Sequence, residues 1–339
     1  MSMTSGIPAY IPRFNRAKPV VAVVAENSST ELTDYVIPYG VLAESGVAQV
    51  LAIATQKGPI QMLPALKLQP QATIAEFDAQ FPEGADYVIV PAVIRRKDPM
   101  LLGWVNAQAQ KGAIIVGVCD GVWVLANAGL LNGRKSVCHW FSFNSLKKKF
   151  PETEWLQNTR YVADGSIITT TGVTASIPVS VALVDAIAGH EKATLVAQAM
   201  GIQSWGTEHD SEQFKLSAKN IFTVVANGIS FWAHENIDIP ITEGVDEVAL
   251  SLVADAYSRT YRSKAFSLHT SDECVITKRG LTIVPDKVHA PKRAASRTIE
   301  LRSDLPPIAS LDITLQEIET LYGASAAEVT ALQLEYSRP

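Results

Sequence analysis

A cysteine between two glycines marks the point where an apolar strand-like run changes into a helix-like run. The stretch reads IIVGVCDGVWVLA and covers residues 114–126, with Cys119 near its centre. A strand that passes directly into a helix needs a sharp turn, and Gly117 and Gly121 let backbone segments approach closely there. A nucleophile at such a turn, a nucleophile elbow, projects away from the sheet. The spacing therefore predicts a reactive Cys119, and the alternative is a small buried cysteine that fills a tight turn.

The position of Cys119 before a helix also predicts how its thiol behaves. The positive end of the helix dipole and the free N–H groups stabilise a thiolate and lower the pKa of a cysteine. The same N–H groups can hold an oxyanion that develops during attack. We therefore expect a lowered pKa for Cys119 and a contribution of the Asp120 backbone N–H to an oxyanion site.

Strand-like and helix-like segments alternate from about residue 18 to residue 190. Short β-branched apolar runs suit strands that are buried on both faces, and their alternation with helices predicts an α/β domain with a mainly parallel sheet flanked by helices. The expected strands are 20–26, 47–55, 86–92, 113–118 and 165–172, and the expected helices are 33–45, 99–112, 121–133 and 175–189.

The pattern changes in the C-terminal region, residues 191–339. Residues 191–235 look mainly helical, and residues 237–270 repeat the strand, helix, strand order of residues 20–55. A hairpin is expected around Arg279 and Gly280, and two helices near the C-terminal end. The sequence thus predicts a first domain at 18–190 and an appended α/β region at 191–339, built partly on a degenerate repeat of the first half that lacks the elbow.

Composition and motifs narrow the function classes. The net charge of −5 and the pI of about 5.7 favour neither a nucleic acid nor an anionic membrane as partner. No run reaches the roughly 18 apolar residues of a membrane span. The three cysteines form no CxxC pair, and no phosphate-binding glycine motif occurs. We expect a cytoplasmic protein with no metal, no cofactor, and no nucleic-acid or membrane partner.

The combined motifs resemble the ThiJ/PfpI superfamily, which has a class I glutamine amidotransferase-like fold. The segment GVCDGVWVLANAGLLNGRKSVCHW matches the family's elbow, and His139 follows Cys119 by 20 residues. The segment TELTDYVIPYGVLAESG resembles the first helix of the family, where an acidic residue, here Asp34, precedes a proline, here Pro38, by four positions. DGSIITTTGVTASIPVSVALVDAIAG resembles the closing strand and helix. The resemblance covers residues 18–190.

The resemblance implies roles for individual residues. The carboxyl group of Asp34 reaches the sulfur of Cys119, stays protonated because like charges disfavour each other, and relays a proton; the alternative is that Asp34 only caps its helix. His139 is either a general acid or base, or a wall of the pocket beside Trp140. Arg95 and Arg96 either contact an anionic substrate or lie on the surface. The other expected oxyanion and pocket residues are Ala92, Val93, Asp120, Gly121, Trp140, Thr171 and Gly172.

Two functions follow from the resemblance. The first is a cysteine-dependent hydratase or hydrolase that acts on a small molecule, since isocyanide hydratase-like members carry an aspartate at the position of Asp34. The alternative is a small-molecule sensor similar to the effector domains of AraC-type regulators, without their DNA-binding part. A redox response of the thiol is a third reading. A homodimer is implied by the resemblance alone.

Overall fold

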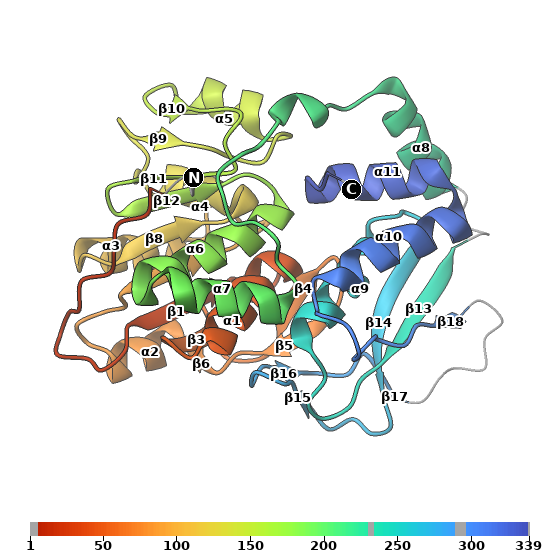
Figure 1. Cartoon of the computed structure of the whole chain (residues 1–339), viewed down its shortest axis with the longest axis horizontal. Helices are drawn as coiled ribbons and strands as arrows, with labels where there is room; N and C mark the ends of the chain where they lie inside the picture. Colours follow the sequence, from red (N-terminus) through yellow and green to blue (C-terminus); the bar gives the residue numbers. More distant parts are fainter. Residues whose placement is uncertain (1–5, 230–233, 289–295, 338–339) are drawn as a thin grey trace.

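The computed structural model describes residues 6–229, 234–288 and 296–337 (Figure 1). Its main sheet has seven strands, of which only the edge strand β11 runs antiparallel to its neighbour. In spatial order they are β11 (Tyr161–Asp164), β12 (Ile167–Thr170), β8 (Ile114–Gly117), β7 (Tyr87–Val90), β1 (Val20–Ala25), β3 (Gln49–Ala54) and β6 (Ala72–Thr73). The predicted α/β class with a mainly parallel sheet is confirmed.

Helices cover both faces of this sheet because its central strands are apolar on both sides. In β1, alternate residues enter two different cores: Val21 and Val23 face one, Val20 and Ala22 the other. The first core includes side chains of α1 (Leu32–Ser45), α6 (Ser176–Ala188) and α7 (His190–Met200). The second includes side chains of α2 (Ile74–Gln80), α3 (Pro99–Gln110) and α4 (Val122–Asn127).

The C-terminal region builds a second, smaller parallel sheet. Its spatial order is β17 (Lys287–Val288), β14 (Ser263–His269), β13 (Glu235–Pro240) and β18 (Ser296–Thr298). The helices of this region are α8 (Ala218–Ile229), α9 (Glu247–Ser258), α10 (Ala309–Tyr322) and α11 (Ala324–Leu334). The strand, helix, strand order expected after residue 235 is therefore present as β13, α9 and β14.

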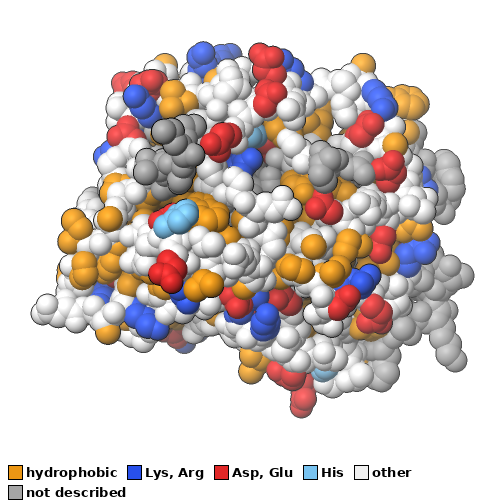
Figure 2. Space-filling view, viewed as in Figure 1, with side chains coloured by type: hydrophobic (Ala, Val, Ile, Leu, Met, Phe, Trp, Pro, Cys, Tyr) orange, Lys and Arg blue, Asp and Glu red, His pale blue; other side chains and the backbone are white. Residues whose placement is uncertain are grey.

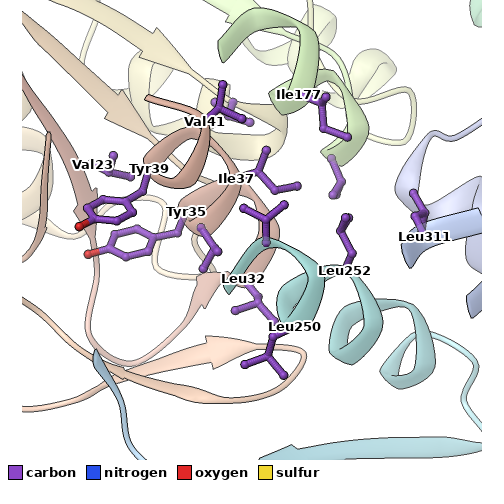
Figure 3. Close-up of a cluster of buried hydrophobic side chains, with 14 of the residues drawn as sticks. Val23, Leu32, Tyr35, Ile37, Tyr39, Val41, Ile177, Leu250, Leu252 and Leu311 are labelled. Atoms are coloured by element: carbon purple, nitrogen blue, oxygen red, sulfur yellow. The ribbon is translucent and has the colours of Figure 1, made fainter. Parts of the chain in front are cut away.

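A shared sheet and a helix pair are among the contacts that join the C-terminal region to the first domain. A mixed sheet runs through both, in the order β15 (Val275–Ile276), β16 (Thr282–Ile283), β5 (Lys67–Gln69), β4 (Ile60–Leu63) and β2 (Thr30–Glu31). Helix α9 packs along α1, and Figure 3 shows Leu32 and Ile37 of α1 near Leu250 and Leu252 of α9. The remaining elements are α5 (Phe143–Lys149), β9 (Lys135–Ser136), β10 (Glu154–Trp155) and three short 3-10 turns at Cys119–Gly121, Val173–Ala175 and Ser211–Gln213.

The helix after the elbow is shorter than predicted. A 3-10 turn, Cys119–Gly121, precedes α4, and α4 ends at Asn127 instead of continuing to residue 133. Gly129 ends the helical path because its φ of +76° is left-handed. The four-residue apolar run before Cys119 and the short helix after it still make the sharp turn that the glycine spacing requires.

The surface carries charges of both signs. On the face shown in Figure 2, basic and acidic side chains are interspersed, and neither sign gathers into a large patch. Among the described residues, no helix combines the length and apolar composition needed to cross a bilayer.

Candidate active site

The backbone at Cys119 is held in an unusual conformation. Its φ of +53° lies in the left-handed region, which a residue with a side chain adopts at a cost. Its N–H donates to Oγ1 of Thr170 at 3.1 Å, which ties the turn to the neighbouring strand β12. A Cβ atom at Gly121 would lie 2.0 Å from the carbonyl oxygen of Val90, so only glycine fits there. These contacts keep the thiol at the carboxyl end of the sheet.

Asp34 lies in the first turn of α1 and is fully buried. Its Oδ2 accepts the backbone N–H of Ala92 at 3.1 Å, whereas its Oδ1 has no hydrogen-bond partner among the described residues. The N-cap of α1 is Glu31, whose side chain accepts the N–H of Asp34 at 2.5 Å. The capping alternative is therefore wrong for Asp34. The hydrogen bond from its carboxyl group to the Cys119 sulfur, which the resemblance implies, is not formed among the described residues.

Both Cys119 and Asp34 favour their neutral forms. Burial, followed by the nearby carboxyl groups of Asp34, Asp120 and Glu31, raises the pKa of the Cys119 thiol well above its usual value. The hydrogen bond from the backbone N–H of Asp120 to the sulfur acts in the opposite direction. Burial likewise raises the pKa of Asp34 well above its usual value. The lowered thiol pKa expected from the helix dipole is thus not found, because desolvation and acidic neighbours outweigh a six-residue helix.

An arginine of the C-terminal region belongs to the same site. Arg259, which ends α9, donates from Nη2 to Oε1 of Glu31 at 2.7 Å and from Nε to Oδ1 of Asp255 at 2.6 Å. Burial opposes the charge of Arg259, but Asp255 and Glu31 raise its pKa above the usual value. Cys119 also contributes to the electrostatic environment of this guanidinium. No motif in the sequence pointed to Arg259 or assigned a role to Glu31.

A cavity of about 510 Å³ opens beside Cys119. Its polar side is formed by the elbow, Glu31 and Arg259, and its apolar side by α8, the loop before α8, and α11. The residues that line it are Glu31, Ala92, Cys119, Asp120, His139, Trp140, Phe141, Val173, Leu216, Asn220, Ile221, Val224, Val225, Arg259, Tyr261, Val329, Leu332 and Gln333. More than half of these residues follow residue 190, so the C-terminal region completes the pocket.

The predicted pocket residues divide into two groups. Ala92, Asp120, His139 and Trp140 line the cavity together with Cys119. The fully buried Asp34 and the other four predicted residues do not line it. Val93 pairs with Thr30 in an isolated bridge, Gly121 is enclosed in the turn, and Thr171 and Gly172 lie toward a separate cavity near Glu335.

The backbone amides expected to hold an oxyanion are already engaged. The Ala92 N–H donates to Asp34, and the Gly121 N–H donates to the carbonyl of Val118 at 2.7 Å. The Asp120 N–H interacts with the Cys119 sulfur and lowers the pKa of that thiol. The oxyanion role given to Ala92 and Gly121 is therefore not supported by this geometry.

His139 uses both ring nitrogens for structural contacts. Its Nδ1 accepts the backbone N–H of Phe141 at 3.2 Å, so the proton resides on Nε2, which lies 3.2 Å from the carbonyl oxygen of Gln333. The ring also packs against that of Trp140. This arrangement favours the pocket-wall reading of His139 over the acid–base reading.

Arg95 and Arg96 lie outside the cavity. Arg95 pairs with Glu26 and Asp98 and is half exposed, whereas Arg96 donates to Oδ2 of Asp120 at 2.8 Å. Their observed partners are protein carboxylates, in agreement with the surface reading.

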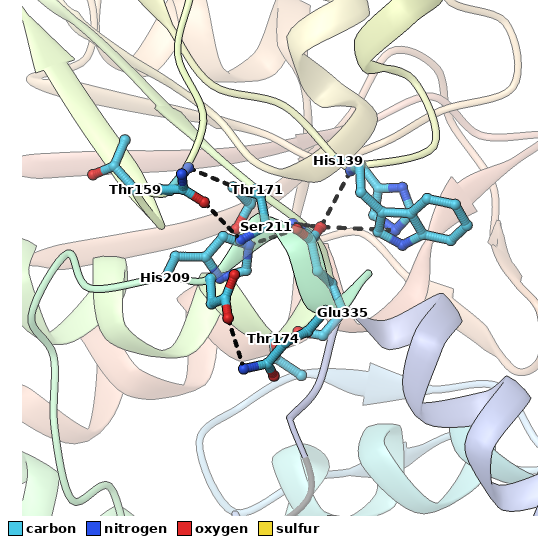
Figure 4. Close-up of polar contacts among 12 residues, drawn as sticks. His139, Thr159, Thr171, Thr174, His209, Ser211 and Glu335 are labelled. Carbon is cyan, nitrogen blue, oxygen red and sulfur yellow. Dashed lines mark hydrogen bonds and ion pairs between the residues drawn. The ribbon is translucent and has the colours of Figure 1, made fainter. Parts of the chain in front are cut away.

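Glu335 fastens the end of α11 to the turn that follows β12 (Figure 4). Its side chain is buried and accepts the N–H of Gly172 at 2.6 Å through Oε2, while Oε1 lies 2.9 Å from Nε2 of His209. Its backbone carbonyl accepts a hydrogen bond from Thr174 at 2.8 Å. No motif points to this residue, because it lies far along the chain from the family segments that the sequence shows.

Comparisons of the sequence with known proteins place the elbow and Asp34 within a known family domain. Residues 19–186 match the model of the DJ-1/PfpI family. An isonitrile hydratase of Pseudomonas putida is 28% identical over 165 residues, which are 47% of this chain and 68% of the hydratase. The transcriptional regulator CdhR of Pseudomonas aeruginosa is 27% identical over 126 residues, and the chain spans only 37% of that regulator's length.

Solved structures similar to this chain cover a little over half of it. DJ-1beta of Drosophila melanogaster has a TM-score of 0.49 at 19% identity and covers 55% of this chain and 99% of its own. A ThiJ/PfpI protein of Pseudomonas syringae has a TM-score of 0.48 at 22% identity and covers 56% of this chain and 81% of its own. Because residues 19–186 match the family model, and because the elbow cysteine and the buried aspartate lie where the family resemblance expects them, this chain carries a domain of the DJ-1/PfpI family.

Proposed function

We propose that this chain hydrates a small isonitrile to the corresponding N-substituted formamide. The observation that carries the proposal is a buried thiol whose pKa is raised by burial and by the nearby carboxyl group of Asp34, with both groups favouring the neutral form. One carboxyl oxygen of Asp34 has no hydrogen-bond partner in the described part of the chain. Such a pair suits a reaction in which S–H adds across a single carbon and no net charge develops.

The chemistry balances with these two groups and water. In the first step the Cys119 sulfur bonds to the terminal isonitrile carbon, Asp34 gives that carbon a proton, and Asp34 recovers a proton from the thiol. The product is a thioimidate, R–N=CH–S–Cys119. Water then adds to the same carbon, the nitrogen gains a proton, and the C–S bond breaks with return of a proton to sulfur. The products are R–NH–CHO and the free thiol.

The engaged amides favour this reaction over ester or amide hydrolysis. Acyl transfer passes through a tetrahedral oxyanion, and the loss of one hydrogen-bond donor to that oxyanion costs about 10²–10³ in rate. Here the N–H groups of Ala92 and Gly121 are both committed to other acceptors. Addition to an isonitrile needs no such donors in its first step. The similarity to an isonitrile hydratase supports the same choice.

A second function, effector binding without turnover, is favoured by a different observation. The cavity is walled mainly by apolar side chains, and Cys119 is only 6% exposed within it. Several proteins similar to this domain are transcriptional regulators. In this case the ligand would fill the cavity and the thiol would remain unmodified. The expectation that the chain binds no nucleic acid stays a prediction.

The test is to incubate the purified chain with a small alkyl isonitrile and to follow the formamide by NMR. We expect turnover by the wild type, none by C119A, and a loss of about 10²-fold or more in kcat for D34N, since proton transfer contributes 10²–10⁴-fold. C274S is the matched control, because Cys274 is exposed and lies outside the cavity. Equal turnover by C119A, or binding of the isonitrile with no turnover, would reject the hydratase proposal.

A further inference from the structure

The second sheet repeats the architecture of the first. The order β6-β3-β1-β7 in the main sheet corresponds to β17-β14-β13-β18, and all neighbours in both sets run parallel. Five elements of the C-terminal region start 215 residues after their counterparts. For example, β1 starts at Val20 and β13 at Glu235. The pairs are β1 and β13, α1 and α9, β4 and β15, β5 and β16, and β6 and β17.

The two copies meet through equivalent elements, as the subunits of a twofold dimer do. Helix α1 packs on its counterpart α9, and β5 pairs with its counterpart β16, where Leu68 lies opposite Ile283, its own equivalent. Single contacts obey the same symmetry. Gly40 lies against Val248, and Thr33 donates to Oδ2 of Asp255 at 3.1 Å. Asp255 is the equivalent of Gly40 and Val248 is the equivalent of Thr33, so the two contacts are related by the symmetry.

We propose that residues 235–288 are a reduced second copy of the domain's first half, which packs on that half as the second subunit of a dimer would. This copy supplies Arg259 as a positioning residue for Cys119. The guanidinium holds Oε1 of Glu31, and Oε2 of Glu31 holds the N–H of Asp34, so a chain of contacts runs from the second copy to the proton carrier. Arg259 also lines the cavity beside Cys119 and places a positive charge among the acidic groups there.

The N-terminal end of α9 is equivalent to the N-terminal end of α1 but has no counterpart of Asp34 or Cys119. It therefore provides a control. There Asp246 caps α9, as Glu31 caps α1, and Arg279 donates to Oδ2 of Asp246 at 3.0 Å. Arg279 also binds Glu44 at 2.6 Å and Glu247 at 3.2 Å, and its side chain is 5% exposed. The position equivalent to Asp34 is Ala249, and Arg279 does not line the Cys119 cavity. Loss of Arg279 thus disturbs the packing of the copies but not the site.

The experiment measures alkylation of Cys119 by iodoacetamide in the full chain, read by mass spectrometry of the Cys119 peptide. Removal of a nearby positive charge disfavours the thiolate, so R259Q should react about tenfold more slowly at pH near 8.5, which corresponds to about one pKa unit. R259K keeps the charge and should react at nearly the wild-type rate. R279Q should match R259Q in loss of thermal stability and keep the wild-type alkylation rate.

Two outcomes would overturn the inference. One is a folded R259Q, verified by circular dichroism, whose alkylation rate is unchanged or increased. The other is an R279Q that slows alkylation as much as R259Q does, since that result would make the effect one of general packing. The readout needs no isonitrile, so it stands or falls separately from the proposed hydration, although the importance of the thiol rests on that proposal.

Discussion

Cys119 has a strained backbone conformation at the turn that holds its thiol. A left-handed φ on a residue with a side chain costs roughly 1–3 kcal/mol, and it persists only where the surroundings fix it. Here they do, through the Thr170 hydroxyl and the contact of Gly121 with Val90. Strain held by several independent contacts is typical of functional residues. Asp34 carries a different cost, because one oxygen of its buried carboxyl group has no hydrogen-bond partner among the residues that the structure describes.

The raised pKa of Asp34 predicts how stability responds to pH. A carboxyl group with a higher pKa in the folded state binds its proton more tightly there, so its contribution is fully present below about pH 4 and is lost as pH rises toward the folded pKa. D34N cannot ionise and escapes this loss. We therefore expect the unfolding free energy of D34N to gain on the wild type between pH 5 and pH 8 in urea titrations, by up to about 1.4 kcal/mol per pH unit.

Glu76 offers a control of opposite sign. Hydrogen bonds from the backbone and side chain of Thr73, the N-cap of α2, lower the pKa of Glu76, so Glu76 is ionised throughout that pH range. E76Q should differ from the wild type by the same amount at both pH values. A D34N difference that is equally flat would show that Asp34 ionises normally in the folded chain.

At the scale of elements, α1 has the most demanding position. Its first turn carries Asp34, one side packs on the main sheet, and another side packs on α9 (Figure 3). Nearly all of its residues are buried, and Gly40 allows the close approach to α9. An element with so little exposed surface tolerates few changes, because every face has a packing partner.

The Gly40 contact yields a prediction about packing. A Cβ at Gly40 would lie 2.5 Å from Cγ2 of Val248, closer than atoms approach without a shift of the helices. G40A should therefore destabilise the chain by about 1–3 kcal/mol in urea titrations, despite the better helix propensity of alanine. G103A in α3 is the matched control, since no atom lies within 4 Å of the added Cβ. G103A should stabilise by about 0.5–1 kcal/mol. If G40A also stabilises, α1 and α9 do not pack as closely as described.

The elements of the first domain could be predicted because their signals are local. The run VVAVVA has an apolar residue at every position, Gly46 ends α1 in a left-handed conformation, and the glycines around Cys119 report a sharp turn. The predicted extent of the helix after the elbow was wrong, because Gly129 turns left-handed and the apolar residues Leu130 and Leu131 join the second core from beyond the helix end. The direction of the Cys119 pKa was also missed, because desolvation depends on neighbours that no local pattern reveals.

At the scale of the whole molecule, the site is assembled from parts of the chain that are far apart. Arg259, Val329, Leu332 and Gln333 reach the cavity from the C-terminal region. Their sequence neighbours carry no motif, because an arginine at a helix end or a leucine on an amphipathic helix is ordinary in any protein. Such residues reach a site only through tertiary packing, so the sequence predicted Cys119 and Asp34 as a candidate pair and left more than half of the pocket wall unassigned.

Glu335 is the contact that should control the access to this pocket. Its buried carboxylate binds the Gly172 N–H and approaches His209, and it thereby fixes the end of α11, which lines the cavity. E335A removes charge-assisted hydrogen bonds and should lower the unfolding free energy by about 2–3 kcal/mol. It should also speed alkylation of Cys119, because a loosened α11 exposes the thiol. E328A on the same helix is the control, since Glu328 is half exposed and pairs only with Lys219, an interaction worth at most about 1 kcal/mol. If E335A is as stable as E328A and the thiol reacts no faster, the C-terminal end is not what closes the pocket, and the apolar wall formed by α8 becomes the element to test.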